Sequence, residues 1–426
     1  MRIGIYTLGC KVNQTESAAM GALLKERGHQ LVNFHEPAEV YIINTCAVTG
    51  ESARKARQII RQTKRRGGKV AVCGCYAQIE SEAVQALGAD MVGGSGNRSA
   101  FVEHLETMAA LDIDNPFQRK DFELLPTIGE SSRTRAFLKL EDGCHNFCTY
   151  CIIPYARGAV RSMPLDEAVK AAKGLAAEGY LEIVLTGIEL SSWGRDLPGA
   201  PPLETLLCAI CAAVPTVRIR LGSLEPRTIT EAFCQALSVH SNLCPHFHLS
   251  LQSGCDKTLA AMGRKYDIAR YAESLRLLRN YFDNPAITTD LIAGFPGENE
   301  VDFAQTMTFL SACRFAAIHV FPFSRRTGTP AATMSEQCSE TVKSQRAAEV
   351  RTLAAQMETA YLKAHIGKTM EVLFEQEKDG FAEGHTANYL RVRVAAAVKK
   401  NSCCTVTFTA CEGTSLLGKL TEESIP

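Results

Sequence analysis

Residues 136–323 alternate two kinds of segment, and this alternation limits the folds that the chain can adopt. Short apolar segments rich in Val, Ile and Leu are separated by longer segments whose apolar residues follow helical spacing. The six strand-like segments are residues 136–140, 181–187, 217–223, 246–252, 286–295 and 316–323. Strands that alternate with helices build parallel sheets, so the pattern predicts a partial (βα)6 barrel of the TIM type. The reactive face of such a barrel lies at the carboxyl ends of its strands.

The first 110 residues show the same alternation on a smaller scale and predict an N-terminal parallel α/β sheet. Three of the predicted turns carry a cysteine just after a strand: Cys10 in TLGCKVNQ, Cys46 in INTCAVT and Cys75 in CGCYAQ. The carboxyl ends of parallel strands gather at one edge of a sheet, which is where ligands bind. Three thiols that are far apart in sequence are therefore expected to come close in space.

The chain is too long, at 426 residues, for one ordinary hydrophobic core, and we expect an α/β protein of three units. The predicted boundaries are 1–112 for the N-terminal domain, 133–365 for the barrel and 366–426 for a C-terminal domain, with a linker at 113–132. The C-terminal segment holds short strand-like stretches broken by Gly and polar turns, which predicts a small β-barrel.

No stretch of the sequence is long and apolar enough to span a bilayer, and no basic N-terminal segment leads into an apolar run. We therefore expect a cytoplasmic protein without membrane association. In that reducing compartment the 17 cysteines stay thiols, so clustered ones are better interpreted as metal ligands than as disulfides. Scattered cysteines on helix-like segments are expected to fill the core. These are Cys208, Cys211, Cys234 and Cys313.

The chain has 46 basic and 46 acidic residues, so its net charge gives no argument for a polyanionic partner. One local segment differs, because eight basic residues and no acid lie between Arg54 and Lys69. Several of them, including Arg57 and Arg61, follow helical spacing. The segment is either an ordinary solvated helix face or a stripe that binds phosphates.

Three further cysteines lie close together just after the first barrel strand, in EDGCHNFCTYCIIPYARG: Cys144, Cys148 and Cys151. Thiolates are soft ligands that suit iron-sulfur clusters and zinc. A structural zinc site needs four donors, and His145 is poorly placed as the fourth because it adjoins Cys144. A 4Fe-4S cluster normally takes four cysteines, so three leave one iron open to a substrate. The triplet therefore favours chemistry at a cluster over a structural metal site.

The spacing of this triplet, with Tyr150 before the last thiol and a barrel-type strand before the loop, resembles the motif of radical S-adenosylmethionine (SAM) enzymes. The resemblance implies a 4Fe-4S cluster whose open iron chelates the amino and carboxylate groups of SAM. It also implies reductive cleavage of SAM to a 5′-deoxyadenosyl radical.

The likeness extends along nearly the whole chain. TLGCKVNQTES, NTCAVT and CGCYAQ resemble the N-terminal domain of the methylthiotransferases, whose three cysteines hold a second 4Fe-4S cluster; Cys10, Cys46 and Cys75 stand at those positions. Cys75 is chosen over Cys73 because the family's ligand is the cysteine of the Gly-Cys pair that precedes Ala-Gln. HLSLQSG and TTDLIAGFPGE match the family's barrel segments, and the tail from about Ile366 resembles its TRAM domain, an RNA-binding β-barrel.

TLGCKVNQ and FPFSRRTGTPA most resemble the branch that methylthiolates N6-threonylcarbamoyladenosine in tRNA, beside the anticodon. The branch that modifies a ribosomal-protein aspartate has Pro after the first cysteine, where this chain has Lys11. The expected function is thus transfer of a methylthio group to carbon 2 of that nucleoside, with two 4Fe-4S clusters and SAM. The expected partners are the tRNA anticodon loop and an electron donor such as flavodoxin or ferredoxin, and the chain is expected to be a monomer.

Besides the six cluster cysteines, residues on other loops are expected to position SAM. Tyr150 is placed against its adenine, and Gly187 and Glu189, in the TGIE turn, near its amino group. The alternatives are packing for Tyr150 and a solvated loop acid for Glu189, since loop acids are usually exposed.

A second set, at the ends of later barrel strands, is expected to contact the ribose or the substrate. Ser250, Gln252 and Asp290 belong to it, because polar residues at strand ends of such barrels are often functional. His248 alternates inward with its strand neighbours and is interpreted as a satisfied core histidine.

RNA contacts are predicted in two places. The tail from Gly367 holds about as many acids as bases, so the barrel offers no strongly basic surface. Backbone docking is then expected to depend more on the basic segment between residues 54 and 69. The predicted RNA-binding residues are Arg54, Arg57, Arg61, Arg391 and Arg393.

Several alternative functions remain open at this stage. Within the same family, the substrate would be isopentenyl-adenosine in tRNA or an aspartate of a ribosomal protein. Outside it, the chain would be a non-catalytic iron-sulfur protein that binds RNA, or a zinc protein.

Overall fold

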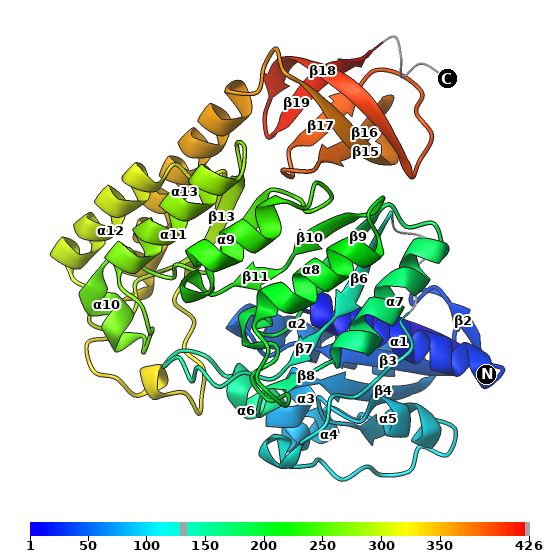
Figure 1. Ribbon diagram of the computed structural model, residues 1–426. Helices are drawn as coiled ribbons and strands as arrows, with labels where there is room; N and C mark the ends of the chain where they lie inside the picture. The colour runs from blue at the N-terminus through cyan, green and yellow to red at the C-terminus, as the bar shows by residue number, and fades with distance from the viewer. Residues whose placement is uncertain (128–133, 422–426) are drawn as a thin grey trace.

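The N-terminal unit of the computed structural model, which describes residues 1–127 and 134–421, is an open parallel sheet (Figure 1). Its strands are β1 (Arg2–Thr7), β2 (Gln30–Val32), β3 (Val40–Thr45), β4 (Lys69–Gly74) and β5 (Met91–Val92). Its helices are α1 (Lys11–Glu26), α2 (Gly50–Lys64), α3 (Cys75–Ile79), α4 (Ser81–Ala86) and α5 (Arg98–His104). All six residues of β3 are buried, as expected for a central strand covered on both faces.

The strand order of this sheet is β2-β1-β3-β4-β5, and every pairing is parallel. The order reverses between β1 and β3, because α1 returns the chain to one side of β1 and the next connection crosses to the other side. In sheets of this order the crevice at the reversal, outside the carboxyl ends of the strands, is the preferred ligand site.

The central unit contains six parallel strands in the expected order, which confirms the predicted partial barrel. They are β6 (Arg135–Lys139), β9 (Glu182–Thr186), β10 (Arg218–Leu221), β12 (His246–Leu249), β13 (Ala286–Ala293) and β14 (Ala317–Pro322). The two-residue strand β11 (Ser223–Leu224) continues β10 beyond Gly222 and pairs with β12, so the barrel wall is continuous there. The barrel stays open between β6 and β14, which are edge strands.

Helices cover the outer face of this barrel, as the alternation of segments predicts (Figure 1). They are α7 (Leu165–Ala177), α8 (Leu203–Ala213), α9 (Glu231–Ser238), α10 (Asp256–Ala261), α11 (Ile268–Tyr281), α12 (Glu300–Cys313) and α13 (Glu340–Lys363). The largest apolar cluster of the chain lies between these helices and the strands and includes the buried Cys211, Cys234 and Cys313. The core role expected for these cysteines is therefore confirmed, and Cys208 packs against the same cluster.

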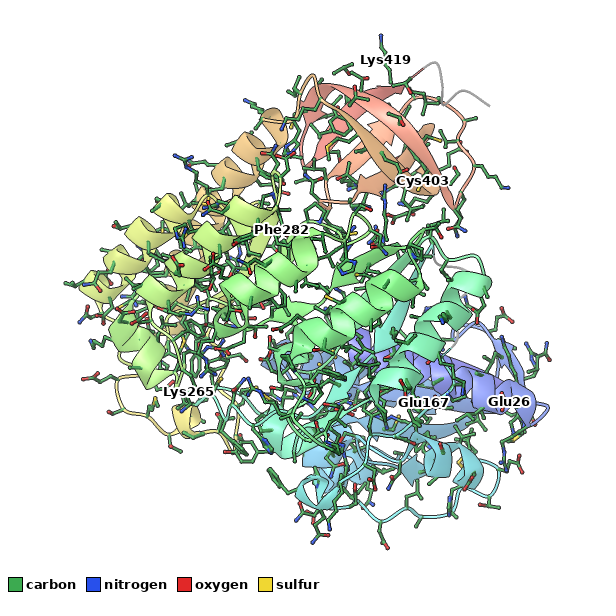
Figure 2. All side chains as sticks on the ribbon, viewed as in Figure 1. Glu26, Glu167, Lys265, Phe282, Cys403 and Lys419 are labelled. Atoms are coloured by element: carbon green, nitrogen blue, oxygen red, sulfur yellow. The ribbon has the colours of Figure 1, made fainter. Side chains whose placement is uncertain are left out.

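The C-terminal unit is a closed five-stranded barrel, which confirms the small β-barrel expected there. Its strands are β15 (Thr369–Lys378), β16 (Phe381–Thr386), β17 (Arg391–Val394), β18 (Ser402–Glu412) and β19 (Ser415–Leu420). It docks on the central barrel through β10, where Arg218 pairs with Glu371 at 2.6 Å and Arg220 donates to the carbonyl of Ala387 at 2.8 Å. Cys403 lies on the side of the C-terminal barrel nearer the central unit, and Lys419 on the outer side (Figure 2).

The predicted linker is only partly described, because its residues 128–132 lie outside the described ranges, as do 422–426 of the C-terminal segment. Its first part contains the short 3-10 helix η1 (Pro116–Gln118). Within residues 1–127 and 134–421, no helix has the length and apolar character that a membrane span requires.

The N-terminal domain contacts both edges of the open central barrel. On one edge, Lys139 of β6 pairs with Glu16 of α1 at 2.9 Å. On the other, the amide of Gly50 donates to the Ser324 hydroxyl, just after β14, at 3.0 Å. The interior of the barrel is thus flanked by the N-terminal domain where its own strands do not close it.

A buried ionic network joins these two domains, with Arg157 of α6 (Ile153–Arg157) at its centre. The fully buried Arg157 guanidinium donates to Glu16 at 2.5 Å, to Asn13 at 2.8 Å and to Asp142 at 3.2 Å. Burial alone would raise the pKa of Glu16, but the surrounding cations outweigh it and hold that pKa well below its ordinary value. The described network contains four cations and two carboxylates: Arg98, Lys139, Arg157 and Arg161 with Glu16 and Asp142.

We predict that Arg157→Met lowers the free energy of unfolding by about 3–5 kcal/mol, because it leaves Glu16 and Asp142 buried with fewer partners. Urea unfolding of the purified protein, followed by circular dichroism, measures this change. The matched control is Arg54→Met, which removes an exposed ion pair with Glu51 and should leave the unfolding midpoint nearly unchanged. Equal shifts in the two variants would contradict a structural role for the network.

Candidate functional site

The first three cysteines lie near one another at the strand-order reversal of the N-terminal sheet. Cys10 follows β1 and precedes α1, Cys46 follows β3, and Cys75 opens α3 directly after β4. Gly9 shows how tightly the loops pack, since its φ is +105° and a Cβ there would lie 2.9 Å from the Cys46 sulfur. Cys73, in contrast, lies inside β4 and is fully buried in the apolar core beneath the sheet. Cys75, and not Cys73, therefore lies at the edge of the sheet that carries Cys10 and Cys46, and its role as a ligand stays a prediction.

Cys46 and Cys75 are buried and Cys10 is exposed, and the surroundings of these thiols are positively charged. Burial raises the pKa of Cys46 to about 11, so this thiol holds its proton at neutral pH when no metal is bound. The Nε of Arg157 lies 3.2 Å from the Cys75 sulfur, and the network behind it carries more positive than negative charge. A metal must displace the proton of each thiol ligand. The cationic network would then offset the negative charge of the thiolates.

The second triplet lies on a loop that is closed at its neck. The two-residue strands β7 (Glu141–Asp142) and β8 (Arg161–Ser162) pair antiparallel at the base of the loop. The Cys144 amide donates to the carbonyl of Gly158 at 3.0 Å. Gly143 has a φ of +88°, and a Cβ there would clash with the carbonyl of Ala159, so the neck requires glycine.

The tip of this loop is anchored to two other barrel loops. The Thr149 amide donates to Met262, and its carbonyl accepts from the Ala331 amide. Arg264 donates to the Cys148 sulfur at 3.2 Å, so this thiol, like Cys75, has a guanidinium beside it. Burial raises the pKa of Cys151 to about 12.

The two triplets face each other across the domain interface. Cys75 is close enough to Cys151 to contribute to raising its pKa. The side chains of Ile152 and Ala156, just beyond the second triplet, pack in the same apolar cluster as Cys75 and Tyr76. The sequence predicted two cysteine sets, but it held no signal that the two loops would lie against each other.

The TGIE turn lies beside the second triplet. A Cβ on Gly187 would lie 2.7 Å from a carboxyl oxygen of Glu141, and that oxygen accepts from the Glu189 amide at 2.7 Å. Asn146 of the cysteine loop donates to the Glu189 carboxyl at 3.3 Å. Burial raises the pKa of Glu189 to about 7. The alternative of a solvated loop acid is therefore wrong, because Glu189 is half-buried and hydrogen-bonded.

Tyr150 packs against an apolar cluster behind the cysteine loop, formed by Met262, Phe295, Phe323 and Ala331. Its burial raises the pKa of the phenol well above the ordinary value. The structure therefore contains the packing contact that was the alternative role for Tyr150. A contact with adenine stays a prediction.

Ser250 and Gln252 lie just after β12, as expected. The Ser250 carbonyl accepts from Tyr266 at 2.5 Å and from Arg264 at 3.3 Å. Gln252 has a φ of +70°, in the left-handed region that non-glycine residues seldom adopt, and its amide donates to the carbonyl of Asp290. Asp290 itself lies inside β13 and not at its end.

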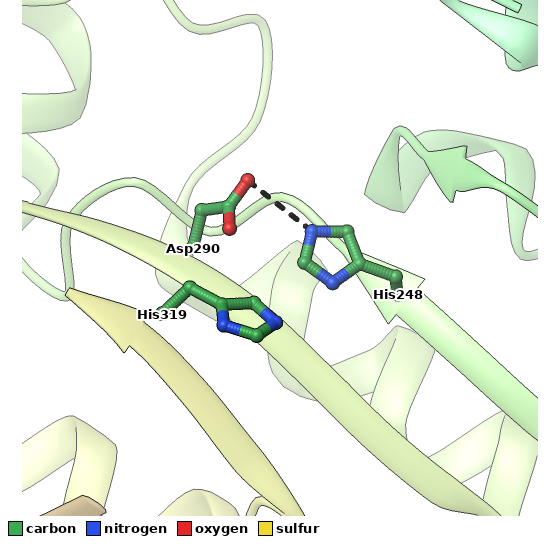
Figure 3. Close-up of side chains that lie close together, drawn as sticks. All are labelled: His248, Asp290 and His319. Atoms are coloured by element: carbon green, nitrogen blue, oxygen red, sulfur yellow. Dashed lines mark ion pairs between the residues drawn. The ribbon is translucent and has the colours of Figure 1, made fainter. Parts of the chain in front are cut away.

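The side chains of His248, Asp290 and His319 converge on the inner face of the barrel (Figure 3). His248 is 3.2 Å from the Asp290 carboxylate through Nε2 and 2.9 Å from Thr288 Oγ1 through Nδ1. Both ring nitrogens of His248 therefore have partners, as expected for a satisfied histidine. The expected place in the core is wrong, because the ring lines a cavity. Potential ligand atoms of these three side chains lie within 4.8 Å of one another, a set that can hydrogen-bond a nucleoside or hold a metal ion.

This cavity has a volume of about 540 Å³ and is walled by all three units. Lys11 comes from the N-terminal domain, Arg220 and His248 from the central barrel, and Tyr389 from the C-terminal barrel. The buried His246 stacks on Tyr389 with ring centroids 4.9 Å apart. Residues of three domains are therefore within reach of a molecule bound in this cavity.

The side chains of the predicted RNA-binding arginines differ in the hydrogen bonds and ion pairs that they already make. Arg54 is held by Glu51 through two bonds of 2.6 and 2.7 Å, and Arg57 lies 3.4 Å from the Tyr76 hydroxyl. Arg61 is exposed and has no side-chain partner within the described ranges. Ion pairs also engage the two arginines of the C-terminal barrel, as Arg391 and Arg393 both contact Glu383, at 2.9 and 3.3 Å.

Sequence reasoning missed two residues of this site, Arg157 and Arg264, which donate to thiols of the two triplets. A signal existed for the first, since Arg157 stands in the quoted stretch PYARG directly after the second triplet. Nothing in the sequence around Arg264 distinguishes it from a surface arginine.

Comparison with known proteins agrees with this arrangement of domains. Residues 2–94 match the family described as "Uncharacterized protein family UPF0004", and residues 139–310 match the Radical SAM superfamily. Among solved structures, the radical SAM methyltransferase TsrM from Kitasatospora setae superposes with a TM-score of 0.58 over 78% of this chain and 77% of that one. At 14% identity this likeness concerns the fold alone.

Relatives of known name cover almost the whole chain. The threonylcarbamoyladenosine tRNA methylthiotransferase MtaB of Bacillus subtilis is 37% identical over 92% of this chain and 89% of its own length. The MtaB of Thermotoga maritima is 35% identical over 91% and 90%. A tRNA-2-methylthio-N(6)-dimethylallyladenosine synthase of Sphingopyxis alaskensis is 33% identical over 88% and 86%. The chain therefore belongs to the radical SAM tRNA methylthiotransferase family and is an enzyme of this kind.

Proposed function

We propose that this enzyme transfers a methylthio group to carbon 2 of N6-threonylcarbamoyladenosine beside the anticodon of tRNA, with two 4Fe-4S clusters and SAM. The observation that carries the proposal is the pair of three-cysteine sets that face each other across the domain interface. The MtaB relatives, whose names specify threonylcarbamoyladenosine, support the choice of nucleoside. A monomer in the cytoplasm, reduced by a flavodoxin or ferredoxin, completes the proposal.

The residues fit two clusters of this type. Each set offers three thiols, so each cluster would keep one iron free for a further ligand. Cys144, Cys148 and Cys151 would hold the cluster that binds SAM, and Cys10, Cys46 and Cys75 the cluster that carries sulfur. When bound, these groups supply the radical that breaks an unactivated aromatic C–H bond and the sulfur that replaces the hydrogen.

The surrounding side chains would position SAM and the target nucleoside and would offset the negative charge of the clusters. Arg157 donates to Cys75 of the first set and Arg264 to Cys148 of the second, and each guanidinium would offset the charge of the thiolates. Glu189 in its carboxylate form would accept from the amino group of SAM, and Tyr150 would pack near its adenine. Asp290 would hydrogen-bond the target nucleoside from the barrel wall.

The RNA would approach the cavity between the three units. A nucleotide of the anticodon loop can leave its stack, because single-stranded loops present splayed bases to their proteins. The C-terminal barrel, which we interpret as a TRAM domain, and the basic face of α2 would contact the backbone. Of the arginines that we predicted for this role, Arg61 is the freest.

A second candidate is the same transfer to dimethylallyl-type adenosine, which the name of the Sphingopyxis alaskensis relative specifies. A methylthiotransferase for a ribosomal-protein aspartate is a further alternative. So is a non-catalytic iron-sulfur protein that binds RNA, in which loss of Cys148 would abolish RNA binding or folding.

Mass spectrometry of tRNA nucleosides tests the proposed substrate. A deletion strain should lose the 2-methylthio form of N6-threonylcarbamoyladenosine and keep that of the dimethylallyl nucleoside. The gene for the intact chain should restore the lost form, and a Cys148→Ala variant should not. Loss of only the dimethylallyl form would contradict the proposal.

Iron and sulfide counts on the protein reconstituted without oxygen test the two clusters. About eight irons per chain are expected, falling to about four when either cysteine set is replaced by alanine. About four irons, lost only with the 144–151 set, would rule out the sulfur-carrying cluster.

We predict a pH-dependent role for Glu189 in binding SAM. Its pKa of about 7 makes the carboxylate predominant only above neutral pH, and the carboxylate accepts from the SAM amino group more strongly than the protonated acid does. Affinity for SAM should therefore rise from about pH 6 to about pH 8, and Glu189→Gln should flatten this rise. Calorimetric titration of both proteins isolates the effect, because the amino group of SAM titrates alike in each. Parallel pH profiles would contradict the role.

We also predict that Arg57→Ala combined with Arg61→Ala weakens tRNA binding and lowers the slope of log K against log salt by about 1.5. Filter binding across a range of salt concentrations measures this slope. The control pair, Arg391→Ala with Arg393→Ala, should change it less because Glu383 and Glu412 already pair with these arginines. An unchanged slope in the α2 variant would make that helix an ordinary solvated face.

A further inference from the structure

Among the described residues, one cation that lines the cavity between the three units has no hydrogen-bond or ion-pair partner. Three Lys or Arg side chains line it: Lys11, Arg220 and Arg391. Arg220 is paired with Glu182 through bonds of 2.6 and 2.9 Å, and Arg391 with Glu383 at 2.9 Å. Lys11 makes no hydrogen bond or ion pair with any residue of the ranges 1–127 and 134–421. Its ammonium group is therefore available to a ligand.

The surroundings of Lys11 favour an anionic ligand. The Lys11 residue is exposed in the cavity, and the guanidinium groups of Arg220 and Arg135 lie close enough to repel its ammonium group. Glu182 also lies nearby, but it already pairs with both arginines, at 2.6 and 3.3 Å. An ammonium group beside two guanidinium groups gains more from an added anion than an isolated one would.

The position of Lys11 relative to Cys10 narrows the identity of this anion. Lys11 is the first residue of α1 and directly follows Cys10, and the helix is fixed by Asn13 and Glu16 in the buried network. If Cys10 helps to hold the sulfur that is transferred to carbon 2 of adenosine, then the backbone of Lys11 lies one residue from a ligand of that sulfur-carrying cluster. Carbon 2 and the carbon bearing N6 flank the same ring nitrogen, so a substituent on N6 reaches the same side of the base.

We propose that Lys11 binds the carboxylate of the threonylcarbamoyl group and thereby selects this nucleoside over neutral N6-substituted adenosines. The inference rests on the proposed function and adds to it the residue that reads the substituent. A dimethylallyl group in the same place would leave the ammonium group without a partner and displace water from it, which is costly. Sites built around a polar group discriminate strongly against analogues that lack it.

The test compares two RNAs that differ by one charge. Anticodon stem-loops would carry N6-threonylcarbamoyladenosine either as the free acid or as its methyl ester, which keeps the shape and removes the charge. Dissociation constants are measured by fluorescence anisotropy with the anaerobically reconstituted enzyme. The wild type should bind the acid about 10-fold or more tightly than the ester, the range of one charge-assisted hydrogen bond.

Lys11→Met should reduce this acid-to-ester ratio to about one, by weakening binding of the acid and not of the ester. Lys11→Arg, which keeps the charge, should retain most of the preference. Lys25→Met, in the last turn of the same helix and exposed, is the matched control and should behave as the wild type. Iron and sulfide per chain should be equal in all four proteins, which excludes an indirect effect through Cys10.

Two results would overturn the inference without touching the proposed function. In the first, Lys11→Met weakens binding of both RNAs equally, as expected if Lys11 contacts a phosphate. In the second, the variant keeps the preference for the acid over the ester. In either case wild-type enzyme would still methylthiolate the acid RNA. If wild-type enzyme modified only a dimethylallyl-adenosine stem-loop, both the inference and the proposed function would fail.

Discussion

The site depends on the buried hydrogen bonds and ion pairs of the Arg157 guanidinium. It belongs to the central barrel, yet two of its partners, Asn13 and Glu16, belong to α1 of the N-terminal domain. A cation this deep is stable only because carboxylates lie beside it. The same group donates to the Cys75 sulfur, so one side chain fixes the domain interface and shapes the charge around a thiol.

Two parallel sheets meet at this interface with their ligand-binding edges. The carboxyl edge of the N-terminal sheet carries Cys10, Cys46 and Cys75, and the first loop of the central barrel carries the other set. Each set alone would be a common arrangement for a metal cluster. Their opposition is the observation behind the proposed reaction, in which one cluster would supply a radical and the other would supply sulfur.

Much of this organisation could be predicted from the sequence, because local patterns carry it. Alternation of apolar segments predicted the six barrel strands and the N-terminal sheet, and spacing identified the cysteine loop. Residue environments were less predictable. Glu189 was open to interpretation as a solvated acid, Asp290 was placed at a strand end, and His248 was placed in the core, since burial depends on neighbours far away in the chain. The ion pairs that engage Arg391 and Arg393 were hidden for the same reason.

The sequence by itself determined the fold class, the family and the cysteines that are candidates for two clusters. Periodicity and residue spacing are local properties, so they can be recognised in the linear sequence. Only the tertiary structure decided that the two cysteine sets face each other and that Arg157 and Arg264 serve their thiols. It also placed Lys11 in a cavity shared by three domains, with no partner in the part of the chain that the structure describes. Such facts depend on which residues come together when sheets and domains pack, and no local pattern along the chain records that.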